Sequence, residues 1–175
     1  KNVNELKNDF EFGITIECSD LDRLGKVKEY FTKVKKVINI DHHPGNKLFG
    51  DYNYVESSAA AVGEHIYDIL KAMKIKFDKD IASCIYTSIL TDTGSFAYSN
   101  TTKGTHEVVV DLLNYKVVPS EIFSKVYETS SVGKVLLLGL AICTLEVNVE
   151  KKVAWVTLTA DSFTKTRTTY EDAEG

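Results

Sequence analysis

The tripeptide Asp41-His42-His43 contains the side chains of this sequence that are best suited to metal chemistry. It follows the apolar run 37–40, which predicts a buried strand. An acid and two imidazoles at the end of such a strand bring metal ligands to the rim of a sheet, where α/β proteins keep their active sites. The alternative is a surface loop in which the three residues are adjacent by accident. The tripeptide alone leaves both interpretations open.

Asp92 is a second candidate ligand. Apolar residues recur at three- and four-residue spacing over 81–90, which predicts a largely buried helix. Asp92 then falls at or just past the C-terminus of this helix, where Gly94 can adopt a positive φ and turn the chain. A carboxylate at the negative end of a helix gains nothing from the helix dipole, so it needs a cation or another donor nearby. Without a cation, Asp92 would be a cap or turn residue.

Glu17 is the third candidate ligand. The alternation of apolar residues over 14–16 indicates a short strand that delivers Glu17 at its end. Ser19 or Asp20 can then cap the helix that begins near Asp22. Two strand ends, each followed by acidic or histidine residues, are therefore available to form one site.

These elements predict an α/β fold with a doubly wound, mostly parallel sheet flanked by helices and a helix-rich second half. Strands near 12–17 and 36–41 flank a helix from about 22 to 31, so the unit is βαβ with a right-handed crossover. Further expected elements are a helix through Met73 capped by Ser57 or Ser58, helices beginning at Asp78 and at Thr105, helices over 119–128 and 132–143, and a β-hairpin over 145–159.

The composition is that of a globular intracellular protein. Hydrophobic residues make up 43% and charged residues 26% of the 175 residues, which is enough for a substantial core. The net charge is -4 and the lysines are interspersed with acids, which argues against long duplex nucleic acid as a partner. No apolar stretch approaches the length of a membrane span, and three cysteines without framework spacing favour a reducing compartment. We therefore expect a cytoplasmic protein with short phosphorylated substrates and no membrane partner.

Taken together, the three segments resemble the DHH phosphoesterase superfamily (DHH/DHHA1, RecJ-like), and most of all its nanoRNase/pAp phosphatase (oligoribonuclease) branch. Members of that branch show an acid-Cys-Ser-Asp-Leu-x-Arg-Leu-Gly segment and a Thr-Asp-Thr-Gly-x-Phe-x-Tyr-Ser-Asn-Thr segment. These segments are present here as Glu17 to Gly25 and Thr91 to Thr101. The resemblance runs through nearly all of the chain and implies a DHH phosphoesterase domain.

The resemblance also implies a binuclear manganese-type site, in which magnesium is an alternative. Residues Glu17, His42 and Asp92 would be metal ligands, with Glu17 bridging both ions, and His43 and Asp41 would be catalytic, with His43 facing the phosphate. Two divalent ions about 3.5 to 4 Å apart can lower the pKa of a bridging water and neutralise phosphoryl oxygens. Imidazole and carboxylate ligands without a thiolate suit manganese or magnesium better than a closed zinc site.

Three further residues are candidates for substrate binding. Arg23 can reach a phosphate with two N–H groups or pin the Asp20 turn, and both interpretations stay open. Asn100 can donate a hydrogen bond to the scissile phosphate. His106 begins a helix and can approach the substrate, although a capping or surface role is the alternative.

Two departures from the family pattern affect what can be inferred. The family carries Asp where Glu17 stands, and the extra methylene moves the carboxylate by roughly 1 to 1.5 Å, whereas metal–ligand distances are held to about 0.2 Å. Asp20 is a candidate substitute for Glu17 as ligand. The family's first motif, a His followed by Asp-x-Asp, does not occur in the sequence. We therefore expect an N-terminally truncated DHH domain over 1–163, and a linker that starts over 164–175 and leads to a DHHA1-like domain that the chain lacks.

The implied function is hydrolysis of short oligoribonucleotides or small nucleotide phosphates by a water that two metals activate. Phosphoadenosine phosphate and the products of cyclic dinucleotides are the small substrates considered. Without the first motif, one of the two metal positions loses ligands. The catalytic activity of the isolated segment is therefore expected to be impaired. The alternative is a catalytically impaired nucleotide-binding or regulatory module on the same fold. A homodimer through the apolar 132–140 stretch is compatible with the sequence.

Overall fold

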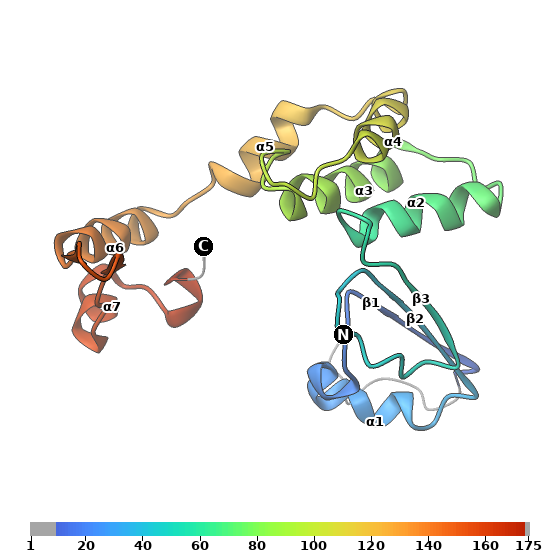
Figure 1. Ribbon diagram of the computed structural model, residues 1–175, viewed down its shortest axis with the longest axis horizontal. Coiled ribbons are helices and arrows are strands. Elements are labelled where there is room, and N and C mark those ends of the chain that lie inside the picture. Colours follow the sequence, from blue (N-terminus) through green and yellow to red (C-terminus); the bar gives the residue numbers. More distant parts are fainter. Residues whose placement is uncertain (1–9, 174–175) are drawn as a thin grey trace. The chain divides into compact units, whose positions relative to one another are not determined.

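The computed structural model describes residues 10–173, in which three parallel strands form one sheet (Figure 1). The strands are β1 (Phe12–Ile16), β2 (Lys36–Asp41) and β3 (Tyr52–Val55), in the order β1-β2-β3. Parallel register pairs Ile16 with Ile40, so both strands end at the same edge. The predicted α/β class and the parallel pair of strands are confirmed, whereas the short strand β3 was not predicted.

The connection between β1 and β2 differs from the single helix predicted over 22–31. It consists of a 3-10 helix, η2 (Leu21–Val27), and one turn of α-helix, α1 (Lys28–Phe31). Gly25 breaks the regular helix because its φ of 54° is left-handed. The predicted cap is confirmed, since the Asp20 side chain accepts a hydrogen bond from the backbone N–H of Asp22.

A helical layer follows the sheet in the chain. Its members are α2 (Val62–Ala72), α3 (Lys79–Asp92), α4 (Lys103–Leu113) and the first residues of α5 (Pro119–Tyr127). The apolar faces of these helices form a core whose fully buried members are Ala61, Ala82, Ile89 and Leu112. The core holds the end of α3 in a fixed place beside α2 and α4 (Figure 1).

The starts of these helices test three predicted caps. Asp78 caps α3 as predicted, accepting from the backbone N–H of Ile81 at 2.8 Å. Helix α4 begins two residues before Thr105, because Thr102 is the N-cap and Thr105 completes a capping box. The cap predicted at Ser57 or Ser58 is wrong, because residues 57–61 form turns and the Ser58 hydroxyl donates to the Glu56 carboxylate instead.

Residues Phe123–Gly175 form a second compact unit, separate from Lys1–Ile122. It contains α6 (Val132–Cys143), which has the bounds predicted from the sequence, and an antiparallel hairpin of β4 (Glu146–Asn148) and β5 (Val153–Trp155). Helix α7 (Ala160–Thr166) and the 3-10 helix η3 (Tyr170–Ala173) lie where a linker was predicted to start. The domain ranges 1–163 and 164–175 stay predictions, and their ends, residues 1–9 and 174–175, lie outside the described residues.

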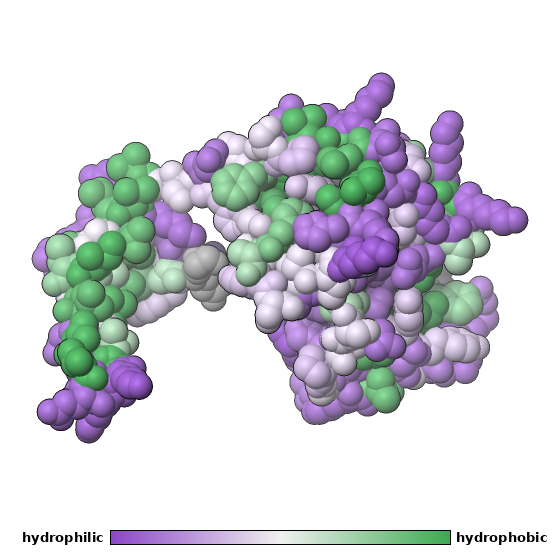
Figure 2. Space-filling view, turned by 45° about the horizontal axis from the view of Figure 1, so that its top comes forward, coloured by the Kyte–Doolittle hydropathy of each residue, from purple (hydrophilic) through white to green (hydrophobic). Residues whose placement is uncertain are grey.

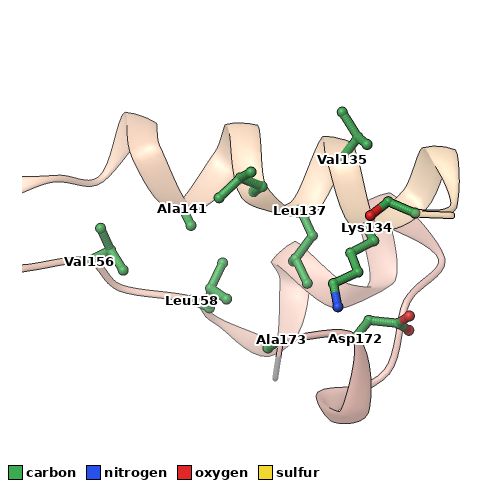
Figure 3. A pocket seen from close by; sticks show the side chains of 10 residues that line it. Lys134, Val135, Leu137, Ala141, Val156, Leu158, Asp172 and Ala173 are labelled. Carbon is green, nitrogen blue, oxygen red and sulfur yellow. The ribbon is translucent and has the colours of Figure 1, made fainter. Parts of the chain in front are cut away.

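Helix α6 is apolar on nearly every side. It buries Leu137 and Ala141, while several of its other apolar side chains are exposed, as Figure 2 shows. Leu137 and Ala141 face Val156 and Leu158 across a pocket of about 360 Å³ (Figure 3). Among the described residues, no single helix is long and apolar enough to cross a membrane, and α5 and α6 meet that criterion only as a sharply bent pair.

The ion pair between Lys71 on α2 and Asp111 on α4 supports the helical layer, with a distance of 2.6 Å from Nζ to Oδ2. Asp111→Asn should lower the free energy of unfolding at neutral pH by up to about 1 kcal/mol. The hydrogen bond from Lys71 holds the pKa of Asp111 below its usual 3.8, so this stabilisation is present above that value and is lost as the pH falls through the folded-state pKa. Urea unfolding at a series of pH values measures the difference.

The control for this prediction is Glu107→Gln, which removes the exposed Lys103–Glu107 pair on the same helix. It should cost no more than about 0.5 kcal/mol. A deficit of Asp111→Asn that persisted unchanged into strong acid would mean that lost packing, and not the ion pair, causes the effect.

Candidate metal centre

The predicted ligands come from three element ends that the first unit brings together. Glu17 directly follows β1, His42 directly follows β2, and Asp92 is the last residue of α3. The Glu17 Oε1 atom lies 3.1 Å from His42 Nε2, and Asp92 Oδ2 lies 3.7 Å from the same nitrogen. His42 is therefore the shared neighbour of the two carboxylates, as the sequence predicted for a common site.

Glu17 owes its position to an unusual backbone conformation. Its φ is 61°, in the left-handed region that a non-glycine residue adopts at a cost of about 1 to 2 kcal/mol. Its backbone N–H donates to the carbonyl of Ile40 at 3.1 Å, so the neighbouring strand holds this conformation in place. Strained residues of this kind concentrate at functional sites because the surrounding structure must maintain them.

The orientation of the His42 ring is set by a backbone carbonyl. Nδ1 lies 3.1 Å from the oxygen of Ala59, which can only accept a hydrogen bond, so Nδ1 carries the proton. In the neutral ring, Nε2 then presents its lone pair to the carboxylate of Glu17. Such an arrangement requires either a proton on Nε2 or a metal cation between the two groups.

The donor set also fits a divalent cation. One candidate ligand atom from each of Glu17, His42 and His43 lies within 4.8 Å of the other two. Glu17 Oε2 is buried and has no hydrogen-bond partner among the described residues, as expected of an oxygen that faces a cation. The nearby Cys18 thiol donates to the backbone carbonyl of Asp20, so the set contains carboxylate and imidazole groups without a thiolate. These are the ligands that manganese and magnesium accept.

Asp92 lies at the margin of this set. It approaches His42 but is not one of the three residues whose ligand atoms all lie within 4.8 Å of one another. Burial raises the pKa of Asp92, and the charges of His42 and His43 and a hydrogen bond from Thr91 oppose this effect. The predicted helix end and the turn at Gly94, with a φ of 53°, are confirmed.

Asp41 is fully buried behind the two histidines. Its Oδ1 accepts hydrogen bonds from the Nδ1 of His43 at 2.7 Å and from the backbone N–H of His42 at 2.8 Å, and its Oδ2 accepts from Asn46 at 2.6 Å. Burial, the largest single effect, raises the pKa of Asp41, but the hydrogen bonds from His43, Asn46 and the backbone together lower it. Asp41 is therefore an ionised acceptor that orients His43, and the catalytic roles of both residues stay predictions.

The residues predicted to bind substrate or to replace Glu17 have partners within the protein. The guanidinium of Arg23 donates to the Ser19 hydroxyl at 3.3 Å, and its backbone N–H donates to the carbonyl of Asp20. The carboxylate of Asp20 pairs with Lys47 and caps η2. It does not belong to the group of Glu17, His42 and His43, whose candidate ligand atoms lie within 4.8 Å of one another.

Asn100 links two segments of the centre. Its Nδ2 donates to the carbonyl of Ala60 at 3.1 Å and to that of Asp92 at 3.0 Å. His106 is exposed on α4, and its ring centroid lies 5.5 Å from that of Phe96. The substrate-binding roles of Arg23, Asn100 and His106 stay predictions.

Sequence reasoning missed two residues that contact the centre directly. Asn46 bonds to Asp41, but it stands just after Pro44-Gly45 and has the composition of an ordinary turn residue. Ala59 acts through its backbone carbonyl, which leaves no signal in the sequence. Asn39 is also fully buried, and its side chain donates to Asn46. A polar residue within the apolar run 37–40 was the signal in the sequence that could have identified it.

A scan against protein-family models finds no family that matches the chain. The curated bifunctional oligoribonuclease and PAP phosphatase NrnA of Bacillus subtilis (strain 168) is 30% identical over 175 residues, which cover 98% of this chain and 55% of that protein. Its namesake in Thermus thermophilus is 40% identical over 86 residues, 49% of this chain and 26% of that protein. A solved exopolyphosphatase-related protein from Bacteroides fragilis matches with a TM-score of 0.88 at 24% identity, over 94% of this chain and 49% of that chain.

The chain is a relative of the DHH-family nanoRNase and pAp phosphatases. The resemblance inferred from the motifs is confirmed. The structural neighbour, at 24% identity, supports the DHH-like fold alone. The chain spans about half the length of the Bacillus relative, 55%.

Cation binding by this chain should depend on Glu17. Mn²⁺ at about 100 times its dissociation constant should raise the free energy of unfolding by about 2.7 kcal/mol. Glu17→Gln removes the negative charge and should abolish most of this increase, whereas Glu29→Gln, an exposed acid on α1, should retain it. Urea unfolding with and without Mn²⁺ measures both. Full Mn²⁺ stabilisation of Glu17→Gln would exclude Glu17 as a ligand.

The length of the Glu17 side chain should matter as well as its charge. Glu17→Asp supplies the residue typical of the family but withdraws the carboxylate by about 1.5 Å from His42. We expect the affinity for Mn²⁺ to fall at least about tenfold, because the backbone positions the longer side chain. Isothermal titration calorimetry measures affinity and stoichiometry, and equal values for the two proteins would contradict this role of Glu17.

Proposed function

We propose that this chain contributes the metal centre of a manganese-dependent phosphoesterase that hydrolyses short oligoribonucleotides or small nucleotide phosphates such as phosphoadenosine phosphate. The observation that carries the proposal is the 3.1 Å contact between Glu17 Oε1 and His42 Nε2, with Nδ1 already committed to a carbonyl. The names of the Bacillus and Thermus relatives, bifunctional oligoribonuclease and PAP phosphatase, support the substrate class.

Glu17, His42 and Asp92 are the residues that would hold two divalent cations. When bound, the cations would lower the pKa of a shared water and neutralise charge on the phosphoryl oxygens. Glu17 offers two oxygens, of which one contacts His42 and the other has no partner among the described residues. This arrangement suits a bridging carboxylate.

His43 is placed to act on the substrate. Asp41 accepts the Nδ1 proton of His43, which fixes the ring, and the His43 side chain remains 42% exposed. Because Asp41 holds the ring through Nδ1, the other ring nitrogen, Nε2, is left for contact with the substrate. Arg23, close in sequence to Glu17, is the candidate for a second phosphate group, since its guanidinium makes a hydrogen bond to Ser19 that a substrate phosphate can replace.

A hydrolysis assay tests this function. With a diribonucleotide and with phosphoadenosine phosphate as substrates, the full gene product should show Mn²⁺-dependent release of mononucleotide or phosphate. His43→Ala should lower kcat at least about hundredfold, because a group that contacts the reacting phosphate is lost. Glu29→Gln should keep the wild-type rate.

The opposite result would identify the alternative function. Nucleotide binding without turnover, left unchanged by His42→Ala, would indicate a regulatory nucleotide-binding module in place of an enzyme. Calorimetric titration of the same nucleotides into wild-type protein and His42→Ala separates the two functions.

A further inference from the structure

The Asn46 side chain is saturated with hydrogen bonds. Its Nδ2 donates to Asp41 Oδ2 at 2.6 Å and to the backbone carbonyl of Cys18 at 3.2 Å. Its Oδ1 accepts from Asn39 Nδ2 at 2.9 Å and from the backbone N–H of Leu48 at 2.7 Å. One primary amide has two N–H donors and one oxygen with two lone pairs, so all four positions are in use.

The two bonds from Nδ2 join the two strand ends that carry the proposed ligands. Cys18 follows Glu17 directly, and Asp41 holds the ring of His43. The left-handed Glu17 is therefore held on both sides, by its own N–H bond to Ile40 and by the bond from Asn46 to the next carbonyl along the chain. A change at Asn46 alters the backbone on one side of the site and the histidine on the other.

Asn46 is itself anchored in the interior of the sheet. The Asn39 amide that donates to it is fully buried, and Asn39 Oδ1 accepts a hydrogen bond from the Thr15 hydroxyl at 3.1 Å. Thr15 lies on β1 and Asn39 on β2, so the chain of bonds crosses the sheet before it reaches the loop. Such a fully satisfied polar network is rigid because each member would lose a buried bond if it moved.

We infer that Asn46 is a positioning residue of the metal centre: its NH₂ group sets the spacing between the Glu17 carboxylate and the His43 ring. Asn46 is not a ligand, because its oxygen is occupied by Asn39 and Leu48. The inference rests on the proposed function. Residues behind a first shell of ligands commonly change metal affinity by about 10- to 100-fold when they are replaced.

Asn46→Asp is the sharpest test, because it keeps the shape of the side chain and the oxygen that faces Asn39 and Leu48. It replaces only the NH₂ group, so that an oxygen faces Asp41 Oδ2 and the carbonyl of Cys18. We expect the dissociation constant for Mn²⁺, measured by calorimetry on folded protein, to rise about 10- to 100-fold. The electron paramagnetic resonance spectrum of the bound Mn²⁺ should also change, because the ligand geometry is altered.

The matched control is Asn53→Asp on β3. The Asn53 side chain also bonds to backbone groups, donating to and accepting from Gly50, but it does not contact the centre. Its Mn²⁺ affinity and spectrum should equal those of the wild-type protein. If Asn46→Asp fails to fold, Asn46→Ala replaces it, with the same rise in dissociation constant expected.

The possible outcomes are distinct. A lower thermal midpoint with unchanged Mn²⁺ affinity and spectrum would overturn the inference, because a purely structural residue behaves in that way. Weaker binding with an altered spectrum in folded protein would support it. Wild-type protein that binds no Mn²⁺ would overturn the proposed function itself, together with any role of Asn46 in positioning ligands.

Discussion

The close contact between the Glu17 carboxylate and the His42 ring is the interaction on which the rest of the site depends. A carboxylate oxygen and an imidazole nitrogen lie 3.1 Å apart, and the other ring nitrogen already uses its proton on the carbonyl of Ala59. Two electron-rich atoms at this distance repel each other unless a positive charge lies between them. The hydrogen bonds around the two strand ends hold these two groups close together, so that the position between them suits a proton or a metal cation.

Parallel strand pairing supplies the first level of that support. Because Ile16 pairs with Ile40, the residue after β1 meets the last residue of β2, and acidic and histidine side chains gather at one edge of the sheet. A slip of one residue would turn these side chains to the opposite face. The buried bonds from Thr15 through Asn39 to Asn46 oppose such a slip, since they pair polar atoms in only one register. The register and the site are thus maintained by the same interactions.

Local rules allowed much of the fold to be predicted, and long-range backbone contacts account for most of what was missed. The bounds of α6, the cap at Asp78 and the place of Asp92 at a helix end follow from periodicity and capping. Strand β3 contains residues typical of strands, but it is only four residues long, too short for its periodicity to set it apart, and its pairing with β2 shows it to be a strand. The same holds for Ala59, whose carbonyl orients His42 whatever side chain it carries. The approach of Glu17 to His42 was predictable because both strands end at one edge of a parallel sheet, whereas the place of Asp92 beside them depends on the packing of α3, which the sequence alone does not show.

The departure at position 17 can be understood from the backbone. Glutamate reaches about 1.5 Å further than the aspartate that the resemblance leads one to expect at this position. Glu17 is not extended: its left-handed φ of 61° changes the direction of its Cα–Cβ bond, and the carboxylate still meets His42 at 3.1 Å. The longer side chain therefore meets His42 from a left-handed backbone. The hydrogen bonds that Ile40 and Asn46 make on either side of Glu17 hold that conformation in place, so the position of the carboxylate depends on the backbone as well as on the length of the side chain.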